Sequence, residues 1–213
     1  MSAYISETDA RIFREGIAAA KAYRWTKVEQ ATSKINDPVA KDILRWVQAT
    51  NNKNVSIDTL EYVHRNLSDW PRMSRVGAES ERRMFNENWG PNRVLSWFSG
   101  DSEPISGEGR AALAGAHYAT QNPTQGDAYL RLAWRESRLT RDGQKKLYRL
   151  YKNKLTKEDH AARADHLIWS GYRHYDKAQA LLQFMSKTDR ALMNARMKIN
   201  RNASGMNLSL IHI

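Results

Sequence analysis

The sequence contains no cysteine. This absence excludes a disulfide-stabilised scaffold, a thiol nucleophile and a cysteine-ligated zinc site. Its apolar runs extend over only a few residues, whereas a membrane-spanning helix needs about 20. The first nine residues also lack the basic, apolar and small-residue regions of a secretory signal peptide. We therefore expect no membrane span, and either a cytoplasmic chain or one that has lost its beginning.

Motifs that carry catalysis or bind cofactors are also missing. Neither a His-Glu-x-x-His zinc motif nor a Gly-x-Ser-x-Gly elbow occurs. His160 and His166 are six residues apart, so one helix would place them on different faces. The glycines of segment 100–109 lack the strand and the Lys-Ser/Thr of a phosphate-binding loop. We predict no catalytic, cofactor-binding or metal-binding residues, and no cofactor.

Basic residues, in contrast, are abundant. The 213 residues include 34 Lys and Arg against 23 Asp and Glu, a formal net charge of +11. This balance is typical of a protein with an anionic partner, but a solvated basic surface without a partner explains it equally well. The densest basic cluster is interleaved with Leu and Tyr, which predicts a helix with a buried apolar face and a basic face in water. The cluster comprises Arg138, Arg141, Lys145, Lys146, Arg149, Lys152, Lys154 and Lys157.

Apolar residues recur at helical spacing along the chain, and no segment alternates like a strand. Helix start signals include Asp37-Pro38, Ser56 and a capping box from Thr156 to Asp159, and Gly171 is a stop signal. The predicted fold class is all-α. The helices are expected at about residues 9–23, 27–35, 38–47, 56–67, 71–85, 91–98, 109–120, 126–134, 140–154, 156–169, 174–185 and 191–199.

The order of these helices suggests an irregular helix-pair superhelix, or α-solenoid. Residues 117–133 and 170–182 each contain a helix end, a turn and a helix opened by Asp and Ala. We predict one α-superhelical domain over residues 1–207, with a possible internal boundary in the Gly-, Ser- and Pro-rich segment 99–109. Residues 208–213 form a short apolar tail that fits no helix pattern.

Seven tryptophans occur near predicted helix ends or turns. A large aromatic ring at such a position buries much surface between neighbouring helices while its N–H can still find an acceptor. We interpret them as packing residues. They are Trp25, Trp46, Trp70, Trp89, Trp97, Trp134 and Trp169.

One dipeptide matches the letters of a catalytic motif. Glu136-Ser137 corresponds to the Glu-Ser that carries the catalytic acid of lysozyme-like transglycosylases. In those enzymes a small or aromatic residue follows, and a Gly-x-Met-Gln segment shapes the sugar cleft. Here Arg138 and Leu139 follow, and no Gly-x-Met-Gln occurs. We interpret the dipeptide as part of a structural helix.

The short sequence segments around the tryptophans, taken in order, resemble those of a known family. Residues 8–200 are similar to the amino-terminal superhelical region of soluble lytic murein transglycosylases, especially the alphaproteobacterial branch. The ordered series that carries the resemblance includes Asp37-Pro38-Val39, Leu44-Arg45-Trp46, Asp69-Trp70-Pro71, Trp97-Phe98, Ala133-Trp134-Arg135, Leu155-Thr156-Lys157-Glu158-Asp159-His160, Asp165-His166-Leu167-Ile168-Trp169 and Asp176-Lys177-Ala178.

This resemblance implies a U-shaped α-superhelix that accompanies a carboxy-terminal lysozyme-like domain. In the family that domain cleaves the MurNAc–GlcNAc β-1,4 bond of peptidoglycan and leaves a 1,6-anhydro end. The superhelical region would orient glycan strands or the catalytic domain, in the periplasm. The implied partners are peptidoglycan glycan strands and the catalytic domain of the parent protein, with no nucleic acid. We carry over no catalytic residue and expect this chain alone to be inactive.

Two further interpretations remain open. One is a tetratricopeptide-like adaptor with a basic groove for protein partners, and the other is a helical-repeat protein that binds nucleic acid through Arg and Tyr. For the tail at 208–213, a truncated reading frame with read-through residues is the expectation, and a carboxy-terminal strand that pairs with a partner is the alternative.

Overall fold

The computed structural model describes residues 5–100 and 102–201. These residues form twelve α-helices and two short 3-10 helices, with no strand among them, which confirms the all-α prediction. No helix in this part of the chain has the length and apolar character needed to cross a membrane. The predicted tail at 208–213 lies outside the described residues.

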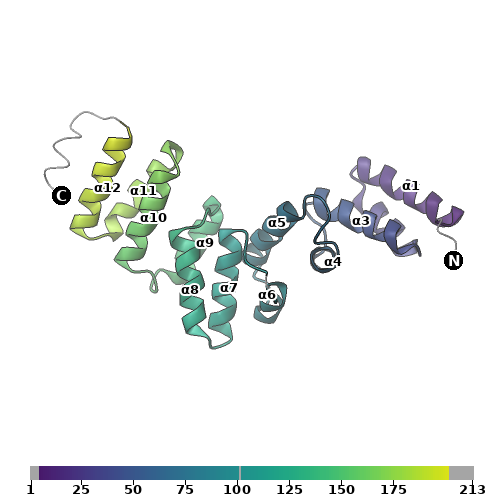
Figure 1. Cartoon of the computed structure of the whole chain (residues 1–213), viewed down its shortest axis with the longest axis horizontal. Coiled ribbons are helices and arrows are strands. Elements are labelled where there is room, and N and C mark those ends of the chain that lie inside the picture. The colour runs from purple at the N-terminus through teal and green to yellow at the C-terminus, as the bar shows by residue number, and fades with distance from the viewer. Residues whose placement is uncertain (1–4, 101, 202–213) are drawn as a thin grey trace. The chain divides into compact units, whose positions relative to one another are not determined.

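The chain divides into two compact units, Met1–Ser80 and Glu81–Ile213, and the division falls inside α5. The first unit holds α1 (Glu7–Lys21), α2 (Trp25–Lys34), α3 (Pro38–Asn51), α4 (Ile57–Asn66) and the start of α5 (Met73–Asn86). The second unit holds the rest of α5, α6 (Pro91–Trp97), α7 (Gly107–Ala119), α8 (Pro123–Arg135), α9 (Arg141–Tyr151), α10 (Lys157–Trp169), η1 (Tyr172–His174), α11 (Tyr175–Leu181), η2 (Leu182–Phe184) and α12 (Lys187–Asn200). Figure 1 labels the α-helices from α5 to α12.

The core of the first unit lies where α1, α2 and α3 meet. Leu44 of α3 is fully buried there, and Gly16 of α1 faces it. A Cβ at Gly16 would lie 3.0 Å from Leu44 and 3.1 Å from Ala31, so the missing side chain allows the helices to approach closely. The other buried core residues are mostly small: Ala19, Ala20, Val28, Ile35 and Ala40.

In both units a buried carboxylate of one helix accepts hydrogen bonds from the residues at the start of a later helix. The first example lies in the first unit. Asp9 of α1 is buried, and its two oxygens accept hydrogen bonds from the backbone N–H groups of Asn36 and Asp37, both at 3.1 Å. Asp37 in turn caps α3 by accepting from the N–H of Ala40. The Asp9 carboxylate therefore fixes where α3 begins relative to α1, because the N-cap residue of α3 donates a hydrogen bond to it.

The second unit repeats this arrangement. Glu81 of α5 accepts from the N–H of Ile105 at 2.9 Å and from the N–H and hydroxyl of Ser106, both at 2.6 Å, and Ser106 caps α7. Segment 99–109, which the sequence offered as a boundary, thus belongs to the second unit and is fastened to α5. A Cβ at Gly109 would lie 2.4 Å from a Glu81 oxygen, so only glycine fits against the carboxylate.

Glu108 forms the next such contact, between α7 and α9. Its Oε1 accepts from the N–H of Thr140 at 2.8 Å and from its hydroxyl at 2.7 Å, and Thr140 caps α9. Gly143 in the first turn of α9 again makes room, since a Cβ there would lie 2.4 Å from the same oxygen. The two contacts place α5, α7 and α9 in a fixed succession within the unit.

Several predicted helix ends are confirmed. Asp37 caps α3 with Pro38 in its first turn, Ser56 caps α4, and Thr156 and Asp159 form a capping box at α10. Gly171, with φ of +106°, follows the end of α10. The predicted start of α8 at residue 126 is wrong, because Asn122 caps the helix and it begins at Pro123. Gly126 lies inside the helix against the Tyr118 ring, which a Cβ would approach to 2.6 Å.

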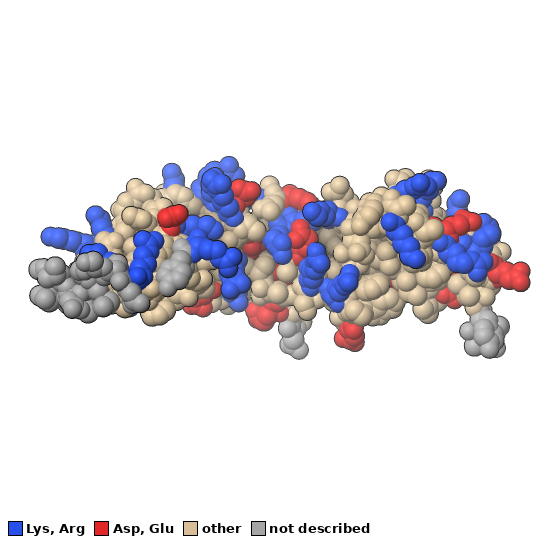
Figure 2. Space-filling view, turned by 90° about the horizontal axis from the view of Figure 1, so that it is seen from above, with Lys and Arg blue, Asp and Glu red and all other residues tan. Residues whose placement is uncertain are grey.

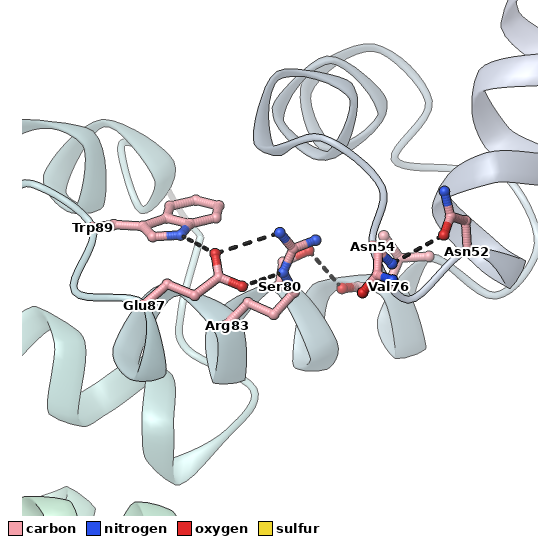
Figure 3. A network of polar contacts seen from close by, with 7 residues as sticks. All are labelled: Asn52, Asn54, Val76, Ser80, Arg83, Glu87 and Trp89. Atoms are coloured by element: carbon pink, nitrogen blue, oxygen red, sulfur yellow. Dashed lines mark hydrogen bonds and ion pairs between the residues drawn. The ribbon is translucent and has the colours of Figure 1, made fainter. Parts of the chain in front are cut away.

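The two parts of α5 have separate polar contacts. In the first unit Ser80 donates to the Val76 carbonyl at 2.8 Å. In the second, Arg83 donates to Glu87 at 2.8 Å, and the Trp89 indole N–H lies 3.4 Å from the other Glu87 oxygen (Figure 3). The hydrogen bond from Arg83 lowers the pKa of Glu87, so this pair keeps its charges at neutral pH.

The tryptophans differ in burial. Trp89, Trp97 and Trp134 are buried, as packing residues should be. Trp169, at the end of α10, is 67% exposed, and its indole N–H donates to Asp165 at 3.1 Å. The packing interpretation is therefore wrong for Trp169, because no helix within the described residues covers its ring.

Candidate functional site

A groove of about 420 Å³ in the second unit is the best candidate site. One side is a stripe of α9, in which Arg141, Lys145 and Tyr148 lie at helical spacing. The other side comes from α11 and η2, through Lys177 and Phe184. The volume is in the range of small-ligand sites. We refer to it as the α9–α11 groove.

Aromatic rings form the wall of the α9–α11 groove. The Trp134 and Tyr148 rings are stacked with centroids 6.0 Å apart, and the Tyr148 and Phe184 centroids are 5.6 Å apart. Behind them the ring of His160, from α10, contacts all three, at 5.0 Å from Phe184. Trp134 is 1% exposed, and its buried indole N–H has no acceptor within the described residues. The wall is thus apolar, with one unsatisfied donor.

Cations surround this wall. Arg141 and Lys145 are exposed, Lys177 is half-buried, and Asp176 is the one acidic residue in the described part of the chain that lines the groove with them. Within the described residues no carboxylate forms an ion pair with any of these three cations. The groove therefore combines an apolar wall with unneutralised positive charge, which suits a ligand with an apolar face and anionic groups.

A buried arginine holds the helices behind the groove in place. Arg163 of α10 is 1% exposed and donates to the backbone carbonyls of Trp134 and Ser137 and, at 2.9 Å, to the side chain of Gln144. Burial lowers the pKa of Arg163 to about 10, against an opposing effect of Glu108, so the guanidinium stays charged at neutral pH. By bonding to the end of α8 and to α9, it fixes the spacing of Trp134 and Tyr148.

The basic cluster predicted around α9 is divided between different roles. Arg141 and Lys145 line the α9–α11 groove. Lys146 is half-buried and is not free in water as predicted: its Nζ donates to the carbonyls of Phe85 and Asn86 and to the side chain of Asn88, at and just after the end of α5. Burial and the nearby Arg149 lower the pKa of Lys146. On the face in Figure 2, Lys and Arg occur along the chain with Asp and Glu among them.

The other residues considered from the sequence lie apart from this groove. Glu136 is exposed at the end of α8. The Ser137 hydroxyl donates to the Leu132 carbonyl at 2.9 Å and accepts from the Arg110 guanidinium at 2.6 Å. His166 is half-buried, and burial followed by the charge of Arg163 lowers its pKa. The described residues contain no group of three or more His, Asp or Glu side chains placed to hold a metal ion.

Comparison with known proteins finds no match. No family model, curated protein or solved structure matches the chain.

Sequence reasoning missed the α9–α11 groove, although half of its signal was visible. The spacing of Arg141, Lys145 and Tyr148 indicates one helix face that is both cationic and aromatic. The opposite side could not be found, because Lys177 and Phe184 lie beyond α10 in the sequence and no motif links them to α9. Chemically, the groove offers binding through contact with the Tyr148 and Phe184 rings and through positive charge.

Proposed function

We propose that this chain is the non-catalytic, superhelical region of a lytic murein transglycosylase and holds peptidoglycan glycan strands in the α9–α11 groove. Its role would be to orient the strands for a separate lysozyme-like catalytic domain, in the periplasm, during cell-wall turnover. The proposal rests on the ordered series of residues that resembles this family and on the chemistry of the groove.

The groove is the observation that carries the binding function. A sugar ring presents an apolar C–H face, which gains contact and leaves water when it lies against aromatic side chains such as Tyr148 and Phe184. Peptidoglycan also bears carboxylates, which the unpaired Arg141, Lys145 and Lys177 would attract.

An adaptor protein is the second candidate. The same cations would attract an acidic protein segment, or nucleic acid, and all-α chains of this kind use concave surfaces for such partners. The aromatic wall distinguishes the candidates only in part, because bases also stack on aromatic rings. Binding measurements with defined polymers therefore have to decide between them.

The deciding experiment is co-sedimentation of the full chain with purified peptidoglycan sacculi, beside retention on heparin and single-stranded DNA. We expect saturable sedimentation with sacculi, and about tenfold weaker binding when Lys145→Glu and Lys177→Glu reverse two groove charges. Tyr148→Ala should weaken binding without changing the net charge, because it removes a stacking surface.

The matched control reverses two lysines outside the groove. Lys152→Glu and Lys157→Glu change the net charge by the same amount at exposed positions near α9, and should leave most of the binding intact. Salt-resistant binding to single-stranded DNA without sacculus binding would overturn the proposal in favour of a nucleic-acid function. Equal losses in the groove and control variants would show that general charge, not the groove, binds the polymer.

A further inference from the structure

A second groove lies in the first unit, between α1 and α2, and its chemistry differs from that of the α9–α11 groove. It encloses about 570 Å³, and its base is formed by the small side chains of Ala18, Ala19 and Ala31. Because alanines lie where the two helices face each other, the longer side chains on either side stand above a hollow. We call it the α1–α2 groove.

One side of this groove is a row of cations on α2. Lys27 and Lys34 of α2 and Arg24, its N-cap residue, all line the groove and are exposed, at intervals of three and seven residues. No described carboxylate pairs with any of the three. Across the groove, Arg11 is already paired with Glu15 at 2.8 Å. The α2 side therefore carries an uncompensated row of positive charge.

The rest of the lining indicates what kind of anion fits. Among the described residues no aromatic side chain lines the α1–α2 groove, so this part of the chain offers no surface there on which a base or a sugar ring could stack. Gln30, exposed between Lys27 and Lys34, adds an amide that can both donate to and accept from a peptide bond. A row of point charges with an amide among them matches a peptide that bears carboxylates.

The spacing of the cations sets the spacing of the carboxylates. A helix rises 1.5 Å per residue, so the Lys27 and Lys34 backbone positions are about 10 Å apart along α2. A peptide in the extended polyproline II conformation rises about 3.1 Å per residue and has three residues per turn. Carboxylates three residues apart then lie on one face of the peptide, about 9 Å apart, and can face the two lysines.

We propose that the α1–α2 groove binds an extended, carboxylate-bearing peptide through Arg24, Lys27 and Lys34. Under the proposed function that peptide is the stem attached to the glycan, and only this identification of its source rests on the proposed function. The two units then divide the recognition of one polymer: the α9–α11 groove contacts sugar rings, and the α1–α2 groove contacts peptide carboxylates.

The direct test measures fluorescence anisotropy of a labelled poly-L-glutamate peptide with the full chain at low salt. We expect binding that weakens about tenfold in the Lys27→Glu, Lys34→Glu double variant and less in the corresponding Gln variant, with a shallower salt dependence in both. The control variant Lys21→Glu, Lys53→Glu has the same net charge, and both positions are exposed and outside the groove. Circular dichroism confirms that each variant is folded.

Three outcomes of this test would overturn the proposal. These are an equal loss of affinity in the groove and control variants, binding of a poly-glutamine peptide as tight as that of poly-glutamate, and stronger competition by polyphosphate than by free poly-glutamate. In each of these cases the row of cations is either a general basic surface or a site for another polymer.

Sacculi treated with an amidase separate this proposal from the proposed function. The amidase removes the peptide stems and with them the cross-links, so the freed glycan strands are immobilised on beads. Lys27→Glu, Lys34→Glu should weaken sedimentation with intact sacculi but not retention on the stripped strands. Tyr148→Ala should weaken both. If the wild-type chain does not bind sacculi but binds poly-glutamate in a way that the α2 variants weaken, the proposed function fails and the peptide site stands. If sacculi bind and the α2 variants have no effect on either polymer, the peptide site fails alone.

Discussion

At the scale of single residues, His160 links the stability of the second unit to its candidate site. The ring is 5% exposed, contacts Trp134, Tyr148 and Phe184, and its Nδ1 has no partner within the described residues. Burial lowers the pKa of His160, and the opposing attraction of Asp159 is smaller. The folded protein thus holds this histidine neutral, directly behind the wall of the α9–α11 groove.

Acid should therefore destabilise the second unit through His160. Its pKa is lower in the folded than in the unfolded chain, so the unfolded chain binds the extra proton first, and stability falls as the pH drops below the ordinary histidine value of about 6.5. Urea unfolding followed by tryptophan fluorescence at pH 8, 7, 6 and 5 measures this. His160→Phe keeps an aromatic ring and should show a shallower loss. The same pH dependence in both proteins would assign the effect to other groups.

At the scale of elements, buried carboxylates decide where later helices begin. Asp9, Glu81 and Glu108 each accept from the N-cap residue of a helix that starts more than 20 residues further along the chain. Such contacts use hydrogen-bond donors that a helix start leaves free, and charge-assisted bonds of this kind are stronger than neutral ones. Gly109 and Gly143 are the matching residues, because their missing side chains leave room for the carboxylates.

Replacing Glu81 by Gln should lower the free energy of unfolding by about 1–3 kcal/mol. The Glu81 carboxylate accepts three hydrogen bonds, from Ile105 and Ser106. The glutamine NH₂ group cannot accept, so it would face one or two of these donors and their hydrogen bonds would be lost. Gly109→Ala should be at least as damaging, since its Cβ meets the same oxygen. Urea titration measures both. Glu136→Gln, an exposed position in the same unit, is the control and should change stability little. A neutral Glu81→Gln would contradict the role of this contact.

At the scale of the whole molecule, each unit has its own buried residues. Leu44 is 0% exposed in the first unit, within a core built by α1, α2 and α3, and Trp134, Leu147 and Ile168 are buried in the second. The division falls within one continuous helix, α5, so a single element contributes residues to both units. Because each core is built from its own buried residues, a substitution in one core is expected to destabilise mainly the unit that contains it.

Leu44→Ala tests this independence. Truncating a fully buried leucine costs about 2–5 kcal/mol, because it removes apolar contact and leaves a cavity. Hydrogen exchange followed by mass spectrometry should show faster exchange in α1 to α4, with α7 to α10 unchanged. Faster exchange throughout both units would show instead that the chain unfolds as one cooperative body.

Much of the local structure could be predicted from the sequence. Asp37-Pro38, Ser56 and the Thr156–Asp159 capping box determine helix starts through contacts with their own first turns, so neighbouring residues carry the whole signal. The helix predicted to begin at Gly126 begins three residues earlier, at Pro123, and Gly126 lies inside it, where its missing side chain leaves room for the Tyr118 ring of another helix. Lys146 was assigned to solvent, because its acceptors are carbonyls some 60 residues earlier.

The sequence by itself determined that this protein is all-α, strongly basic and without cysteine chemistry. It also determined several helix ends, through the residues next to them. Only the tertiary structure decided which charges are used. It buries Glu81, Glu108 and Arg163 to join helices, and it leaves Lys145 and Lys177 unpaired beside Tyr148 and Phe184. The physical reason is that helix formation depends on contacts within a few residues, whereas desolvation and pairing of a charge depend on neighbours brought together by packing.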